Sequence, residues 1–136
     1  MNRKEFEIVF EEWLEAWNSQ DLEGVLGLFA EQAVFESWNG VRVEGREGMR
    51  KVWRSWFEER GPFRFSVEDL FFDEGSQRAA FAWSYEGPAT GGRRGSSRET
   101  RRGVDLIRFE NGKIAKKTTY SKTTIDIDGK RRVLGL

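Results

Sequence analysis

The sequence of 136 residues contains neither cysteine nor histidine. Without cysteine there is no disulfide, no zinc–thiolate site and no thiol nucleophile. Without histidine the chain lacks the commonest metal ligand of proteins and the usual general base near neutral pH. Any acid–base chemistry would therefore fall to Asp, Glu, Lys, Tyr or water, and we expect neither a metal nor a cofactor.

An excess of charge of one sign and long apolar runs are also missing. Lys and Arg together number 23, as do Asp and Glu, so the formal net charge is zero. We therefore expect no nucleic acid and no membrane as a partner. No segment approaches the roughly 18 apolar residues of a membrane span, and the N-terminus, MNRKEFEIVFEEW, lacks the apolar stretch of a signal peptide. The expectation is a cytoplasmic protein whose residues 1–136 form a single domain.

Aromatic residues, in contrast, are abundant, with six Trp, eleven Phe and two Tyr. Each large ring can bury roughly 150–250 Å². These rings could simply fill the core, or some of them could form the wall of a pocket for an apolar ligand. Taken singly each ring is best explained as core, whereas a set around one cavity would touch whatever binds there.

The spacing of apolar residues changes once along the chain. Helical spacing over residues 3–18, 22–32 and 43–61 predicts three helices, with a strand over 33–38 between the second and the third. From residue 63 the period is two, which predicts four long strands over 63–72, 77–87, 97–110 and 113–125. Residues 87–97 would form a flexible loop, and the tail after residue 124 a loose hairpin or a frayed end. Helices followed by a meander of antiparallel strands are typical of an α+β fold.

Three stretches of the sequence resemble the nuclear transport factor 2-like (NTF2-like) superfamily, in its SnoaL-like and ketosteroid isomerase-related branch. They are WLEAWNSQDLEGVLGLFAEQAVFES, VEGREGMRKVW and RRGVDLIRFENGKIAKKTTY. Their order and spacing also fit the superfamily, so the resemblance covers most of residues 5–122. The resemblance implies a cone-shaped, curved antiparallel sheet with three N-terminal helices packed on its concave face. This scaffold carries isomerases, cyclases, epoxide hydrolases and non-catalytic binders, so the fold alone does not assign a function.

The catalytic positions that the resemblance implies are only partly kept. Ketosteroid isomerases have a general-base Asp where this sequence has Ser37, and a hydrogen-bonding Tyr where it has Trp13. Their protonated Asp on the penultimate strand is matched by Asp105. Limonene epoxide hydrolase-like members need an Asp at the position of Thr119. A serine needs a base of its own to abstract a proton, so the sequence does not support the isomerisation. The threonine in place of Asp leaves the epoxide hydrolase reaction unsupported as well.

Asp105 lies in the apolar strand GVDLIRF, residues 103–109. A carboxylate buried there without a partner would cost several kcal/mol, so Asp105 must face water, be paired or serve chemistry. A three-residue turn with a bulge at ENG would place Lys117 opposite Asp105, with Arg101 nearer the rim. A two-residue turn would place Thr118 opposite and point Lys117 away. We favour the first register, which gives a buried Asp105–Lys117 pair, either purely structural or anchoring a ligand.

The side chains on the inner face of these strands, together with aromatic residues of the helices, define the candidate site. Asp105 is the candidate catalytic residue. The candidate ligand-binding residues are Trp13, Trp17, Phe35, Ser37, Trp53, Trp56, Trp83, Tyr85, Lys117 and Thr119. We hypothesise that the cone binds a small, largely apolar or aromatic molecule without a complete catalytic set. The alternative is a SnoaL-like enzyme, a cyclase, isomerase or hydrolase, that uses Asp105 with Lys117.

The opposite face of the same strands predicts an assembly. Val104, Leu106, Ile114 and Tyr120 would form an apolar patch on the outer side of the sheet. Soluble monomers seldom expose such patches over more than a few hundred Å². Related folds commonly dimerise through this face, and the resemblance implies a homodimer here as well.

Overall fold

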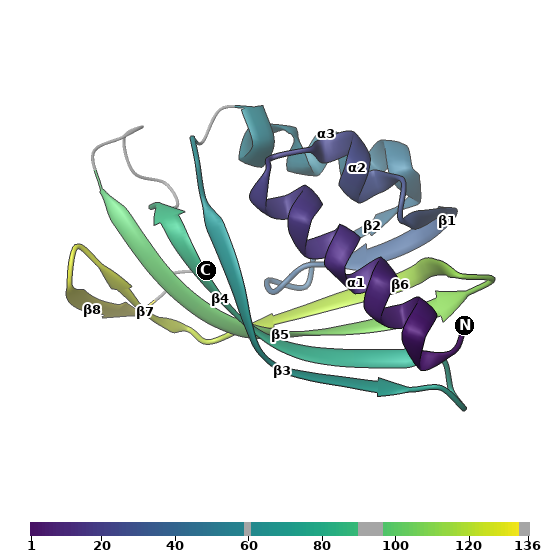
Figure 1. Ribbon diagram of the computed structural model, residues 1–136. Coiled ribbons are helices and arrows are strands. Elements are labelled where there is room, and N and C mark those ends of the chain that lie inside the picture. Colours follow the sequence, from purple (N-terminus) through teal and green to yellow (C-terminus); the bar gives the residue numbers. More distant parts are fainter. Residues whose placement is uncertain (59–60, 90–96, 134–136) are drawn as a thin grey trace.

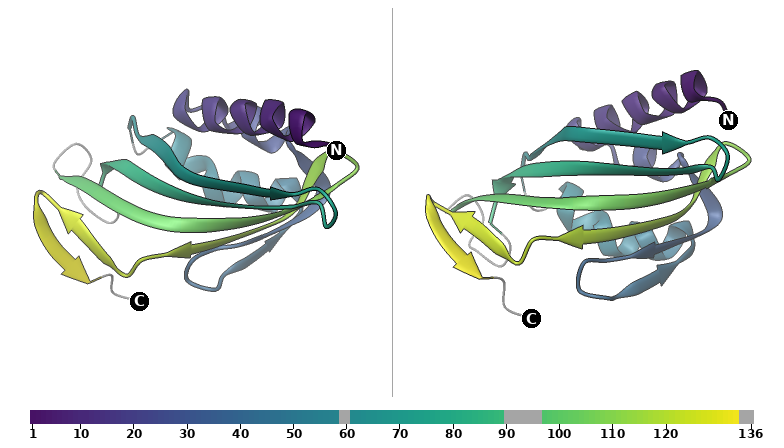
Figure 2. Two further views of the ribbon diagram at one scale, coloured as in Figure 1. Left: turned by 60° about the horizontal axis from the view of Figure 1, so that its bottom comes forward. Right: turned by 90° about the horizontal axis from the view of Figure 1, so that it is seen from below.

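The computed structural model describes residues 1–58, 61–89 and 97–133. Helices cover the concave face of a curved sheet, which confirms the predicted α+β cone (Figures 1 and 2). The helices are α1 (Arg3–Asn18), α2 (Leu22–Leu26) and α3 (Gly45–Glu58). The strands are β1 (Phe29–Glu36), β2 (Arg42–Glu44), β3 (Arg64–Asp73), β4 (Arg78–Pro88), β5 (Arg98–Glu110), β6 (Lys113–Ser121), β7 (Thr124–Ile127) and β8 (Lys130–Val133). None of the helices described in these ranges is long and apolar enough to cross a membrane.

The sheet is mixed, and not antiparallel throughout as expected. Its strand order is β2-β1-β6-β5-β4-β3, and β1 runs parallel to β6. A parallel pair needs a long connection, and here the chain passes through β2, α3 and the β3–β5 meander before it returns beside β1. The C-terminal tail is a hairpin, in which β7 pairs with both β5 and β8.

Helix α1 matches the predicted helix over residues 3–18. Asn2 caps it, because the side-chain oxygen of Asn2 accepts a hydrogen bond from the Glu5 N–H (2.9 Å) and the Glu5 side chain accepts one from the Asn2 N–H (3.1 Å). The helix buries Phe6, Trp13 and Trp17 against the sheet. The helical periodicity of the sequence was therefore a correct guide to the face of α1 that packs in the core.

Helix α2 is much shorter than the predicted helix over residues 22–32. It ends at Leu26, and from Phe29 the chain is strand β1, with Phe29 paired to Ile114 of β6. Gly24 and Gly27 weaken the helical preference of this stretch, and burial of Phe29 in the core stabilises the strand instead. The third predicted helix begins later than expected, at Gly45, because residues 42–44 form β2. Residues 59–60 of that prediction lie outside the described part of the chain.

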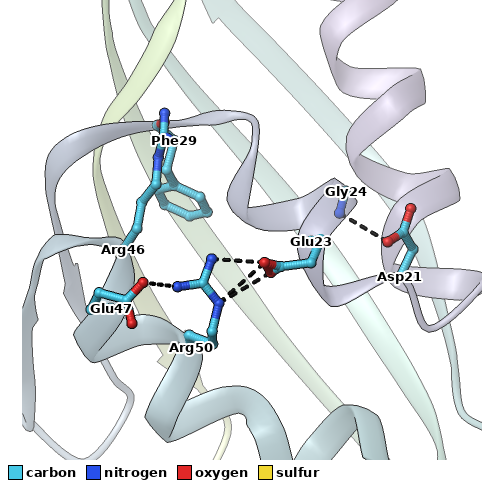
Figure 3. Close-up of polar contacts among 7 residues, drawn as sticks. All are labelled: Asp21, Glu23, Gly24, Phe29, Arg46, Glu47 and Arg50. Carbon is cyan, nitrogen blue, oxygen red and sulfur yellow. Dashed lines mark hydrogen bonds and ion pairs between the residues drawn. The ribbon is translucent and has the colours of Figure 1, made fainter.

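Two arginines attach α3 to the elements that precede it (Figure 3). The Arg46 guanidinium donates to the Phe29 carbonyl oxygen from Nη2 (2.6 Å) and from Nε (3.0 Å). Arg50 donates to Glu23 of α2, with 2.7 Å between Nη2 and Oε1, and it also pairs with Glu47. The hydrogen bond from Arg50 lowers the pKa of Glu23 below its ordinary value. Together these contacts fix α2, β1 and α3 relative to one another.

The β5–β6 hairpin corrects both expected registers. Asn111 and Gly112 have positive φ (50° and 76°), as in a two-residue type I′ turn. Beyond the turn a bulge leaves Ala115 as an extra residue on β6, so that Asp105 faces Thr119 and neither Lys117 nor Thr118. The two-residue turn shifts the pairing by one residue from the favoured register, and the bulge shifts it by one more. Because two residues keep the same side of a strand, Lys117 still points to the concave face.

The same bulge corrects the predicted outer patch. Ile114 lies on the turn side of the bulge and is 1% exposed, in the core, and not on the outer face as predicted. Val104, Leu106 and Tyr120 lie beyond the bulge and are 39%, 46% and 57% exposed. No described helix covers this convex face, which is seen from below in Figure 2. The patch therefore exists without Ile114.

The predicted loop over residues 87–97 falls mainly outside the described structure. Strand β4 extends through Pro88, so the connection to β5 begins two residues later than expected, and β5 begins at Arg98, directly after the predicted end of the loop. Residues 90–96 lie outside the described residues.

Candidate functional site

A cavity of about 140 Å³ lies between α1, α3 and the concave face of the sheet, and it opens to solvent. Every candidate site residue of the sequence lies on its wall: Trp13, Trp17, Phe35, Ser37, Trp53, Trp56, Trp83, Tyr85, Asp105, Lys117 and Thr119. The wall is completed by residues that the sequence did not single out as ligand contacts, namely Leu14, Trp38, Val52, Phe65, Val67, Phe81, Arg101 and Ser121. All six tryptophans of the chain therefore border one space.

Rings from several elements meet around this cavity. Trp13 and Trp17 are one turn apart on α1 and share its buried face. Trp53 approaches them from α3, with 5.3 Å between its ring centroid and that of Trp17, and Phe35 of β1 lies 4.8 Å from Trp53. Alternation along β4 adds Trp83 on the same side of the sheet. The result is an aromatic wall built from both the helices and the sheet.

The charged part of the wall is the pair Asp105 and Lys117. Their side chains are 6% and 7% exposed, and Lys117 Nζ lies 3.1 Å from Asp105 Oδ2. The other carboxylate oxygen, Oδ1, accepts a hydrogen bond from the indole Nε1 of Trp83 (3.0 Å). Lys117 Nζ also donates to Thr119 Oγ1 (2.6 Å). The predicted ion pair is thus present. Its two residues are not directly opposite each other but lie diagonally across β5 and β6.

This answers why an apolar strand tolerates Asp105. One oxygen accepts a hydrogen bond from Trp83 and the other pairs with the Lys117 ammonium, so the carboxylate is neither unpaired nor in water. In this arrangement Asp105 accepts a hydrogen bond through one oxygen and forms an ion pair through the other.

Gly103 makes the Trp83 contact possible. The two residues are directly paired across β4 and β5. A Cβ at residue 103 would lie 2.3 Å from Trp83 Cζ2 and 2.3 Å from the Tyr120 carbonyl oxygen. With glycine there, the indole lies against the backbone of β5 and reaches Asp105, two residues further along. Gly103 is therefore a functional candidate that the sequence did not identify.

Lys117 also lies against aromatic rings. Its Nζ is 4.6 Å from the ring centroid of Phe35 and 5.8 Å from that of Trp53. Both distances are within the range of cation–π attraction. Phe35 and Lys117 are directly paired in the parallel β1–β6 ladder. The charged and aromatic parts of the wall are therefore continuous.

A second buried ion pair adjoins the cavity. Arg101 Nε lies 3.1 Å from Glu99 Oε2, and their side chains are 5% and 0% exposed. The Arg101 guanidinium also lies 5.6 Å from the ring of Trp38. The sequence placed Arg101 near Asp105 but missed Glu99. The signal was available, because Glu99, Arg101 and Asp105 are odd-numbered residues of one strand and so share its inner face.

Within residues 1–58, 61–89 and 97–133, Asp and Glu do not form a cluster of three or more that could coordinate a metal ion. What the cavity can do is enclose a ring system and form hydrogen bonds to it from one side.

Comparison with known proteins agrees with this geometry. RV0760c of Mycobacterium tuberculosis is 17% identical, with a TM-score of 0.77 over 93% of this chain and 98% of that chain. An NTF2-like protein of unknown function from Mesorhizobium loti is 24% identical, with a TM-score of 0.70 over 90% of this chain and 95% of that one. A computationally designed 17-OHP binder is 18% identical, with a TM-score of 0.73 over 90% of this chain and 95% of that one. These likenesses show the NTF2-like fold.

The family is shown by sequence. A search of curated proteins gave no match. The family model of the SnoaL-like domain, however, matches residues 10–117. That stretch runs from α1 to Lys117 and includes most of the cavity wall. The chain belongs to the SnoaL-like domain family, within the NTF2-like superfamily.

Proposed function

We propose that the protein binds a small, largely apolar molecule with an aromatic ring in the cavity between α1, α3 and the sheet. The single observation that carries the proposal is the composition of the wall, in which all six tryptophans surround one space beside a buried ion pair. Ligand pockets of proteins are typically apolar and aromatic, with a few polar groups that fix the orientation of the ligand. A protein with a related fold designed to bind 17-OHP supports this use of the scaffold.

The volume limits the size of the buried part of the ligand. The cavity measures about 140 Å³, and an apolar protein cavity of roughly 150 Å³ holds benzene. One ring, or two rings with a small side-chain movement, would be enclosed. A larger polycyclic molecule would extend through the opening into solvent.

The ion pair favours binding over catalysis. The alternative function is a SnoaL-like enzyme that uses Asp105 with Lys117 as acid and base. Both oxygens of Asp105 already have buried partners, Trp83 Nε1 for Oδ1 and Lys117 Nζ for Oδ2. The residue at the general-base position of the isomerases is Ser37, which has no histidine or cysteine to assist it. Non-catalytic binding needs none of these groups to exchange a proton.

Tryptophan fluorescence tests the proposal directly. Titration with indole or naphthalene derivatives should shift or quench the emission, because every tryptophan borders the cavity. Ser37→Phe, which places a ring in the cavity, should abolish the response. Phe71→Ser, on the exposed outer face of β3 (67% exposed), is the matched control and should not change it. Unchanged emission with all ring compounds, together with a response to nucleotides or sugars, would contradict the proposal.

A further inference from the structure

We infer that Lys117 determines ligand specificity by donating a hydrogen bond to an oxygen of an uncharged ligand, while Asp105 makes the cavity reject charged ligands. This inference rests on the proposed function and adds to it the chemical class of the ligand. It is carried by the two oxygen partners of Lys117 and by the balance of charge in the buried Asp105–Lys117 pair.

The first step concerns the donors of Lys117. An ammonium group has three N–H donors. Within the described part of the chain, Nζ has two oxygen partners, Asp105 Oδ2 (3.1 Å) and Thr119 Oγ1 (2.6 Å). One N–H is left without an oxygen acceptor from these residues, on a side chain that lines the cavity. A ligand oxygen is the acceptor that would complete this coordination.

The second step concerns the sum of charge. The buried Asp105 and Lys117 on the cavity wall form one internally neutral pair. A ligand that enters as a carboxylate or an ammonium would add a buried charge without a counter-charge, which is strongly unfavourable. A ketone, ester or phenol oxygen accepts the free N–H without adding a charge. The balance therefore selects uncharged ligands.

The third step concerns rigidity. Asp105 is fixed by Trp83, which in turn lies against Gly103. Lys117 is fixed by Asp105, Thr119 and the ring of Phe35 at 4.6 Å. A donor held from several sides does not have to be ordered when the ligand binds, so its hydrogen bond contributes more to affinity.

Three probes of nearly the same shape separate these effects: 2-acetylnaphthalene, 2-ethylnaphthalene and 2-naphthoate. Calorimetry or equilibrium dialysis with the intact chain measures their affinities. The wild-type protein should bind the ketone roughly 10-fold to 100-fold more tightly than the hydrocarbon, as expected for one charge-assisted hydrogen bond. It should bind the carboxylate most weakly.

Asp105→Asn is the decisive variant. It keeps the size of the side chain and an oxygen that can accept from Trp83, but it leaves the charge of Lys117 unbalanced. 2-Naphthoate should then gain at least roughly 10-fold in affinity and become the preferred probe, with little change for the ketone. Glu12→Gln removes one carboxylate from the exposed face of α1 and is the matched control, with an unchanged order of affinities.

A double variant covers the case in which Asp105→Asn does not fold. Asp105→Asn with Lys117→Met has no charge in this part of the wall, and near-ultraviolet circular dichroism reports whether it folds. It should bind the ketone and the hydrocarbon equally. Wild-type protein that binds all three probes equally, or prefers 2-naphthoate, would overturn the inference while the proposed function stands. Wild-type protein that binds none of the three overturns both.

Discussion

The indole of Trp83 occupies the space in which any side chain at residue 103 would begin, 2.3 Å from the position of its Cβ. We therefore expect Gly103→Ala to destabilise the protein by about 1–3 kcal/mol, as overpacking in a core does. The second obstacle, the Tyr120 carbonyl oxygen, belongs to the backbone and cannot move as a side chain can. Urea unfolding followed by tryptophan emission measures the change.

A glycine with open surroundings provides the control for this variant. A Cβ at Gly75 would meet only the carboxylate of Asp73, at 3.8 Å, in a surface turn. Gly75→Ala should stay within about 0.5 kcal/mol of the wild type. Equal stability of the two variants would show that the indole does not lie against residue 103.

The Asp105–Lys117 pair should be important for stability as well as for binding. Asp105→Ala is expected to lower the free energy of unfolding by about 3–5 kcal/mol, because Lys117 stays charged and buried without its partner. Replacing both residues should cost less than the sum of the single changes. Additive effects in this double-mutant cycle would mean that the two side chains do not interact.

An exposed ion pair serves as the reference for that cycle. Arg3 and Glu7 on α1 are more than half exposed, with 3.3 Å between Nε and Oε1. Glu7→Ala should change the free energy of unfolding by less than about 1 kcal/mol. The contrast between the two pairs isolates the effect of burial.

We propose that the outer face of the sheet forms a homodimer interface. Val104, Leu106 and Tyr120 are exposed side by side on β5 and β6, and Phe71 on β3 adds a ring to the same face. Leu106→Glu should convert a dimer to a monomer without loss of ligand binding, as measured by light scattering after size exclusion. Val133→Glu on β8 (76% exposed) is the control. A wild-type protein that is monomeric at protein concentrations of tens of micromolar would contradict the proposal.

The contact between α2 and α3 predicts a pH effect. Hydrogen bonding from Arg50 lowers the pKa of Glu23 from its ordinary value of 4.5. A carboxyl whose pKa is lower in the folded state stabilises the fold above its unfolded pKa, and this contribution is lost as the pH falls through the lowered folded pKa. Glu23→Gln should therefore be less stable than the wild type at pH 7, and the two should converge in acid. Urea midpoints at both pH values measure the difference, and an equally large difference in acid would contradict this assignment.

Much of the fold and of the candidate site could be predicted from the spacing of apolar residues over short stretches of the sequence. The period of apolar residues placed Trp13 and Trp17 on one face of a helix, and alternation placed Trp83 and Asp105 on one face of the sheet. These are properties of short stretches, so they can be read without knowing the neighbours in space. The resemblance to the NTF2-like superfamily supplied the direction of that face, toward the helices.

The errors arose where long-range pairing decides the local structure. Residues 27–32 have apolar spacing that suits a helix, yet Phe29 pairs with Ile114 across the sheet. The bulge at Ala115 leaves no mark in composition, although it moves Ile114 into the core and sets Asp105 opposite Thr119. The Glu99–Arg101 pair was not predicted because both residues lie in the charged run SRETRR, a composition that is typical of an exposed segment.

The parallel pairing of β1 with β6 has a consequence for synthesis on the ribosome. Phe35 and Lys117 are neighbours in this ladder, although β2, α3 and the β3–β5 meander separate them in the chain. While the chain is being made, the aromatic faces of α1 and α3 emerge long before the strand that completes their partner surface. Non-local pairings of this kind are slow to form, and the apolar surface they will cover is exposed meanwhile. A nascent chain that stalls before residue 117 would present its tryptophans to chaperones and to other chains instead of to a ligand.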